Sequence, residues 1–173
     1  IDRWRLVRRG LLLYAFGGVF EWLWPGTILF FYGAMFMVGA LLFTLRVRYL
    51  VAIGAVAAIA AAVLRWWVVT GEHLSLDSPE PRTWRGLLLN TFVNGTHPLL
   101  PWLAFFCAGM VLARFLPLST RLRGAVAVCG ALMVAVTYGV RTAFGDSGTT
   151  ARLVTSTSSD SRSIVYTVCA LGS

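Results

Sequence analysis

The sequence predicts an all-α, polytopic membrane protein with about six transmembrane helices. Of its 173 residues, 58% are hydrophobic and 13% are charged, whereas a soluble domain is about half apolar and about a quarter charged. The apolar residues form runs close to one membrane thickness, since a bilayer core of about 30 Å needs roughly 20 helical residues. Arginines stand at the ends of these runs. Membrane topology therefore explains the net charge of +8 better than nucleic-acid binding does.

Three spans are predicted in the first half of the chain, at residues 10–24, 27–45 and 49–69. Residues 1–9, IDRWRLVRR, suit a short interfacial helix or a cytoplasmic lead-in to the first span. The first span ends in interface-type tryptophans, and a Pro–Gly turn separates it from the second. The third span is rich in alanine, which allows close helix packing in lipid.

The second half adds spans at residues 98–115 and 124–140, and a truncated one at 163–173. The first of these begins with two prolines, which cost little in the first turn of a helix. Residues 86–93 are apolar but too short to span, which favours a surface-lying or re-entrant helix. The chain begins without methionine and ends inside an apolar run, so we expect one transmembrane helical domain, residues 1–173, from a longer protein.

Alternating spans distribute the arginines unequally between the two membrane faces. One face would hold Arg3, Arg5, Arg8, Arg9, Arg46, Arg48, Arg114, Arg121 and Arg123. The opposite loops would hold Arg82, Arg85, Arg141, Arg152 and Arg162. The positive-inside rule makes the first face cytoplasmic, which predicts a multi-pass protein of the plasma (inner) membrane with a cytoplasmic N-terminal arginine cluster. The outer face would then hold Glu72, His73, Asp77, Glu80, His97, Asp146 and Asp160.

Two residues are candidates for proton transfer. Glu21 is the carboxylate inside an apolar run, and such a residue is a functional candidate because burying a charge is costly. Alternatively, Glu21 lies close enough to the end of its span to reach water. His97 lies at the predicted mouth of the bundle, where a histidine can act as general base towards a hydroxyl or amine. The alternative is a loop histidine that meets only water.

Candidate phosphate ligands lie on the arginine-rich face. Arg114 ends the 98–115 span, near Arg46 and Arg48 if the spans form a bundle. Guanidinium groups bind phosphate bidentately, so these three residues suit a phosphorylated cofactor. Anchoring to lipid headgroups is the alternative. No metal cofactor is expected, because the three cysteines are scattered and lack metal-ligand spacing.

Three stretches resemble a known family. Residues 8–42 run RRGLLLYAFGGVFEWLWPGTILFFYGAMFMVGALL, and residues 95–114 run GTHPLLPWLAFFCAGMVLAR. Both resemble segments of bacterial membrane proteins related to heparan-alpha-glucosaminide N-acetyltransferase, within the transmembrane acyltransferase superfamily. Residues 161–173, SRSIVYTVCALGS, are similar to the start of a late helix in actinobacterial members.

The resemblance implies an integral membrane O- or N-acyltransferase. It would move an acyl group from cytoplasmic acyl-CoA, acetyl-CoA foremost, to an envelope glycan or glycolipid on the outer side. Arg114 would then lie near the CoA phosphates and His97 near the acceptor. The N-terminal helices that typically carry the family's acyl-transfer histidine are absent from the sequence, so the resemblance implies that this histidine is not among residues 1–173.

Two other functions fit the same composition. One is a lipid or solute transporter in which Glu21 is the coupling group. The other is a non-catalytic membrane subunit of a larger complex. The expected partners are membrane lipids, a glycan or glycolipid acceptor, and either a homo-oligomer or a larger membrane complex, with no nucleic acid among them.

Overall fold

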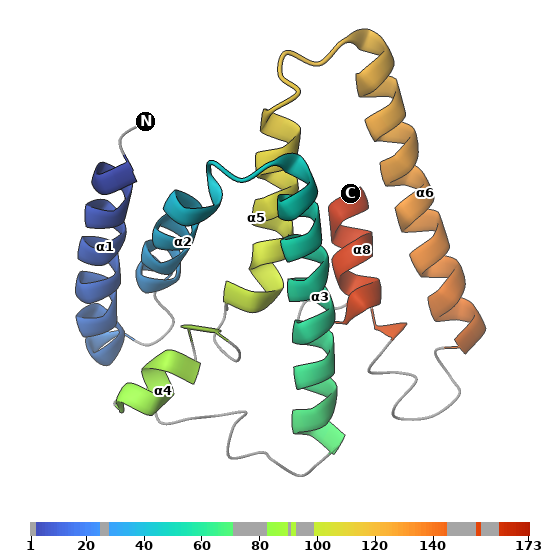
Figure 1. The fold of residues 1–173 in the computed structure, drawn as a ribbon. Coiled ribbons are helices and arrows are strands. Elements are labelled where there is room, and N and C mark those ends of the chain that lie inside the picture. The colour runs from blue at the N-terminus through green and yellow to red at the C-terminus, as the bar shows by residue number, and fades with distance from the viewer. Residues whose placement is uncertain are drawn as a thin grey trace.

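The computed structural model describes residues 3–24, 28–70, 83–89, 91–92, 99–144, 155–156 and 163–173. Within these ranges the chain is helical and contains no strand, which agrees with the predicted all-α class. The helices are α1 (Arg3–Leu23), α2 (Leu29–Leu42), α3 (Val47–Thr70), α4 (Trp84–Leu89), α5 (Leu99–Ala113), α6 (Thr120–Phe144) and α8 (Ile164–Gly172) (Figure 1).

The long helices alternate in direction. Figure 1 shows the starts of α1, α3 and α6 at the end of the bundle where α2, α5 and α8 finish. Each predicted span coincides with a helix to within a few residues, apart from the first. There α1 begins at Arg3 and continues without a break to Leu23, so the basic N-terminal segment is the lead-in to the first apolar run.

Only part of the six-span prediction is borne out. Within the described residues, Val47–Leu64 of α3 and Thr120–Phe144 of α6 are long and apolar enough to cross a membrane. Helices α2 and α5 are apolar but have 14 and 15 residues, against the roughly 20 that a bilayer core requires. Helix α8 has 9 residues. The prediction of about six spans is therefore not confirmed.

The helices pack as three pairs, α1 with α2, α3 with α5, and α6 with α8. Contacts between the pairs are much sparser, and α5 makes several of them because it meets both α2 and α8. Two buried apolar clusters follow this arrangement. One joins Phe30 and Phe31 of α2 to Leu87 of α4, and the other joins Leu50 of α3 to Cys107 of α5.

Glycines allow the backbones of α1 and α2 to touch. A Cβ atom at Gly33 would lie 2.4 Å from the backbone nitrogen of Tyr14 and 2.7 Å from the carbonyl oxygen of Gly10. A Cβ atom at Gly17 would lie 2.4 Å from the backbone nitrogen of Phe30. Side chains at these positions cannot be accommodated by rotamer changes, because the obstructing atoms belong to the backbone. Small residues at a helix contact allow this close approach.

Most of the apolar surface of the two longest helices stays outside the core. Only 22% of the residues in Val47–Leu64 and 6% of those in Thr120–Phe144 are buried. Large side chains such as Val128, Leu132 and Val136 are exposed on α6. A core helix of a soluble protein has the opposite distribution, since its apolar side chains are removed from water.

We expect Gly33→Ala to destabilise the protein by roughly 1–3 kcal/mol, the usual cost of forcing extra atoms into a packed contact. The measurement is the unfolding free energy of the purified protein in detergent. Gly109→Ala in α5 is the matched control, because a Cβ atom at Gly109 meets nothing within 4 Å and alanine favours helix. A Gly33→Ala protein as stable as the Gly109→Ala protein would contradict direct backbone contact between α1 and α2.

Candidate functional site

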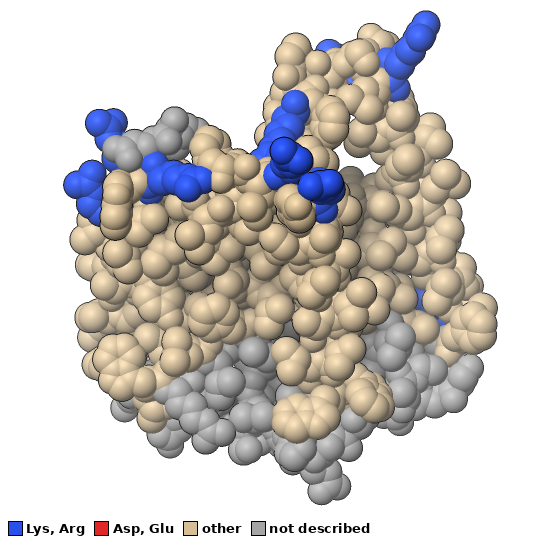
Figure 2. Space-filling model, in the orientation of Figure 1, with Lys and Arg blue, Asp and Glu red and all other residues tan. Residues whose placement is uncertain are grey.

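The described arginines gather at one end of the bundle. Figure 2 shows basic side chains above the start of α1, the α2–α3 connection and the α5–α6 connection. This cationic end consists of Arg3, Arg5, Arg8, Arg9, Arg46, Arg48, Arg114, Arg121 and Arg123. Three described arginines lie elsewhere: Arg141 in the last turn of α6, Arg65 in the C-terminal third of α3, and Arg85 in α4. The sequence-based distribution assigned Arg65 to neither membrane face, and its place in α3 puts it with the arginines opposite the cationic end.

Two arginines hold the α2–α3 connection in place. Arg3 of α1 donates from Nη2 to the hydroxyl of Thr44. Arg114, just beyond α5, donates from Nη2 to the carbonyl oxygen of Phe43 at 2.9 Å. A cation at a helix C-terminus satisfies carbonyl groups that have no partner inside the helix. Arg114 thus fastens α5 to the end of α2, close to the segment that carries Arg46 and Arg48.

Arg46 and Arg48 differ in how their guanidinium groups are engaged. Arg48 donates to the hydroxyl of Tyr49 at 3.0 Å, and its guanidinium carbon lies 4.8 Å from the centre of that ring. Arg46 is exposed. Its carbonyl oxygen accepts the first hydrogen bonds of α3, from Tyr49 and Leu50, while its side chain makes no hydrogen bond to the described residues. Among Arg46, Arg48 and Arg114, the guanidinium of Arg46 is therefore the most available to bind an anion.

Glu21 lies at the other end of α1 and is buried, with 7% of its surface exposed. The buried residues of α1 are Gly10, Gly17, Gly18 and Glu21, whose spacing places them on one helical face. Because Gly10 and Gly17 contact α2, Glu21 lies on the packed side of α1. Burial favours its interpretation as an intramembrane ionisable group over a carboxylate open to water.

A hydrogen-bond chain that was not predicted from the sequence joins Tyr14 of α1 to Thr91 and Leu87. Thr91 is fully buried, and its hydroxyl donates to the carbonyl oxygen of Leu87 at 2.7 Å. A hydroxyl has one hydrogen, so Tyr14 donates its own to the Thr91 hydroxyl oxygen, at 3.0 Å. The chain ties α1 to the segment that follows α4. Neither residue belongs to a motif, so the sequence carries no signal for this pair.

The structure does not describe the remaining candidates. His97, His73 and the predicted outer carboxylates from Glu72 to Asp160 lie outside the described residues. Among the residues that are described, no three His, Cys, Asp or Glu side chains come together as metal ligands. Of the predicted site residues, the structure therefore brings Arg114 close to the Arg46–Arg48 segment and places Glu21 at the opposite end of the bundle.

We expect Arg114→Ala to lower the unfolding free energy by about 0.5–1.5 kcal/mol, the net value of one intramolecular hydrogen bond. Unfolding of the purified protein measures this change, with Arg46→Ala as control, because the Arg46 side chain has no hydrogen-bond partner in the described part of the chain. Equal stability of the two variants would show that the Phe43 contact contributes nothing.

Comparison with known proteins identifies no relative of this chain. No family model, no curated protein and no solved structure matches the chain. The resemblance of residues 8–42 and 95–114 to transmembrane acyltransferases therefore remains a hypothesis. The positions of the charged residues and the apolar surface around them are therefore the observations that bear on function.

Proposed function

We propose that the chain is a multi-pass protein of the plasma membrane, with its cationic end in the cytoplasm. Two observations support this proposal. The longest apolar helices leave most of their side chains outside the core, and the arginines cluster at one end of the bundle. The positive-inside rule associates such a cluster with the cytoplasm. The helices shorter than a bilayer core would be completed by flanking residues or by local thinning of the bilayer.

Within that membrane protein we propose an acyltransferase. It would take an acyl group from cytoplasmic acyl-CoA, with acetyl-CoA the first donor to test, and pass it to an envelope glycan or glycolipid at the outer surface. The observation that carries this proposal is the cationic end, where Arg46 presents a guanidinium with no hydrogen bond to the described residues. The resemblance of two stretches to transmembrane acyltransferases supports the same reaction.

The proposed reaction assigns different tasks to the two ends of the bundle. Arg46 and Arg48 would bind the CoA phosphates, while Arg114 would position their segment through Phe43 and offer its remaining N–H groups. At the far end a base, with His97 and Glu21 as candidates, would take the proton of the acceptor hydroxyl or amine as it attacks the thioester carbonyl. The CoA thiolate would leave. Arg3 and Glu21 are about 27 Å apart along α1, so the thioester end of acyl-CoA would have to extend from the phosphate site into the bundle for the acceptor to attack it.

A transporter is the second candidate, and the burial of Glu21 favours it. Buried carboxylates inside membrane helices serve as proton relays in pumps and transporters. Acyl-CoA binding discriminates between the two functions, because coupled transport needs Glu21 to change its ionisation but needs no phosphate site. A non-catalytic subunit would show neither acyl-CoA binding nor transport on its own.

We expect Arg46→Gln combined with Arg48→Gln to weaken acetyl-CoA binding about tenfold or more. Losing charge-assisted contacts to phosphate costs roughly 1.5–3 kcal/mol, and 1.4 kcal/mol corresponds to a factor of ten. Calorimetric titration of the protein in nanodiscs measures the change. Arg9→Gln is the control, because it also removes positive charge from the cationic end but lies on α1, outside the α2–α3 connection. Failure of the unaltered protein to bind acetyl-CoA would refute the enzyme proposal.

The orientation can be tested with single cysteines in a protein whose Cys107, Cys129 and Cys169 are replaced by alanine. We expect an impermeant maleimide to label Ser78→Cys on intact cells, because the polar loop after α3 would lie outside. We expect Ser119→Cys, in the α5–α6 connection, to react only after permeabilisation. Labelling of both positions in intact cells would overturn the proposed sidedness.

A further inference from the structure

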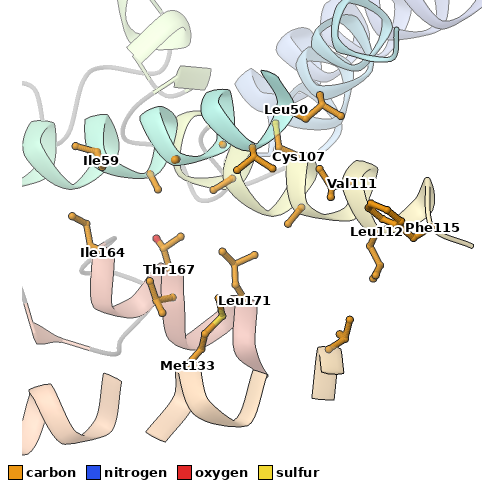
Figure 3. A pocket seen from close by; sticks show the side chains of 18 of the residues that line it. Leu50, Ile59, Cys107, Val111, Leu112, Phe115, Met133, Ile164, Thr167 and Leu171 are labelled. Carbon is orange, nitrogen blue, oxygen red and sulfur yellow. The ribbon is translucent and has the colours of Figure 1, made fainter. Parts of the chain in front are cut away.

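An apolar cleft separates the α3–α5 pair from the α6–α8 pair. Its volume is about 720 Å³, within the range of small-molecule sites. Figure 3 shows side chains from α3 and α5 facing those of α6 and α8 across it. The lining is aliphatic or aromatic apart from Cys107 and Thr167. Because Thr167 donates its hydroxyl to the carbonyl oxygen of Ser163 at 3.1 Å, the cleft offers little to a polar ligand.

We expect a ligand to fill a void of this size. Protein interiors are close-packed and contain few voids larger than a water molecule. Water would gain almost no hydrogen bonds from this lining, because an ordered water needs several polar partners. The occupant is therefore a hydrocarbon group.

The depth of the cleft matches one leaflet of a bilayer. On α5 the lining extends from Ala104 to Phe115, and on α6 from Leu122 to Met133. At 1.5 Å per residue each stretch covers about 16 Å, and half of a hydrocarbon core of about 30 Å is about 15 Å. Phe115 and Leu122 lie at the cationic end, so the cleft extends from that end to about mid-bundle. An acyl chain of a lipid in the adjacent leaflet has this length.

The same end of the cleft carries positive charge. Arg114 directly precedes the lining residue Phe115, and Arg121 and Arg123 flank the lining residue Leu122. Arg123 donates from Nε to the carbonyl oxygen of Leu118 at 3.0 Å, which leaves its terminal N–H groups available. Arg121 is exposed and makes no hydrogen bond to the described residues. These cations favour a headgroup of net negative charge over a zwitterionic one, because the ammonium group of a zwitterionic headgroup offsets its phosphate.

We propose that this cleft binds an acyl chain of an anionic phospholipid from the leaflet at the cationic end, with the lipid phosphate held by Arg121 and Arg123. The site requires the protein to lie in a membrane but does not require acyl transfer. The phosphate position is also distinct from that proposed for acyl-CoA, because Arg121 and Arg123 lie in the first turn of α6, whereas Arg46 and Arg48 lie at the start of α3.

The test is native mass spectrometry of the full chain, titrated with phosphatidylglycerol and with phosphatidylcholine of the same acyl chains. We expect phosphatidylglycerol to bind about tenfold more tightly. Arg121→Gln with Arg123→Gln should remove that preference, while Arg9→Gln at the same end of the bundle should keep it. Equal binding of the two lipids by the unaltered protein would overturn the proposal.

A second pair of variants tests the cleft itself. Ala58→Phe with Ala108→Phe adds bulk to its lining and should lower phosphatidylglycerol binding at least tenfold. Ala52→Phe is the control, because Ala52 is exposed on α3 outside the lining.

If the filled protein does not fold, the unaltered protein is titrated with glycerol 3-phosphate, which should not displace the lipid. Undiminished binding in a folded filled protein, or displacement by glycerol 3-phosphate, would refute a site for the acyl chain. Neither result depends on acetyl-CoA binding, so this proposal and the enzyme proposal fail separately.

Discussion

Apolar side chains cover the flanks of this bundle and guanidinium groups occupy its end, and the two distributions share one cause. The chain has an accessible surface of 10921 Å², compared with about 8300 Å² expected for a compact soluble monomer of its mass. Large exposed side chains such as Leu12, Val19 and Leu132 make up part of that surface. In a bilayer this exposure costs nothing, whereas an arginine in the hydrocarbon costs several kcal/mol. Exposed apolar flanks, with most of the described arginines at one end, are therefore the distribution expected of helices that face lipid.

Without a hydrophobic force between helices in lipid, close backbone packing has to hold them together. Glycine supplies it within the pairs. Gly33 meets Gly10 and Tyr14 across α1 and α2, and in the α6–α8 pair a Cβ atom at Gly130 would lie 2.5 Å from the carbonyl oxygen of Gly172. No comparable set of contacts joins one pair to the next. The cleft beside α5 is a consequence of this difference, because the interface that lacks backbone contact is where space remains.

How much the sequence reveals depends on the range of the interaction. Long apolar runs bounded by arginine predicted the helices to within a few residues, since a helix satisfies its backbone hydrogen bonds locally. The nine arginines assigned to one face lie at one end of the bundle, while their side of the membrane stays a prediction. Arg114 was predicted as a phosphate ligand, but its described partner is the carbonyl oxygen of Phe43, 71 residues earlier. A backbone acceptor has no sequence signature, so neither this contact nor the Tyr14–Thr91 hydrogen bond was foreseeable. Helix length also fell short of the six predicted spans.

The position of Arg114 separates the two anion sites that we propose at the cationic end. Its hydrogen bond to Phe43 binds α5 to the end of α2, which fixes the α2–α3 connection with Arg46. The neighbouring residue Phe115 lines the cleft, on whose other side lies Arg121. A phosphate at Arg46 and a lipid phosphate at Arg121 would thus be bound by different segments, the start of α3 and the first turn of α6, with the end of α5 between them.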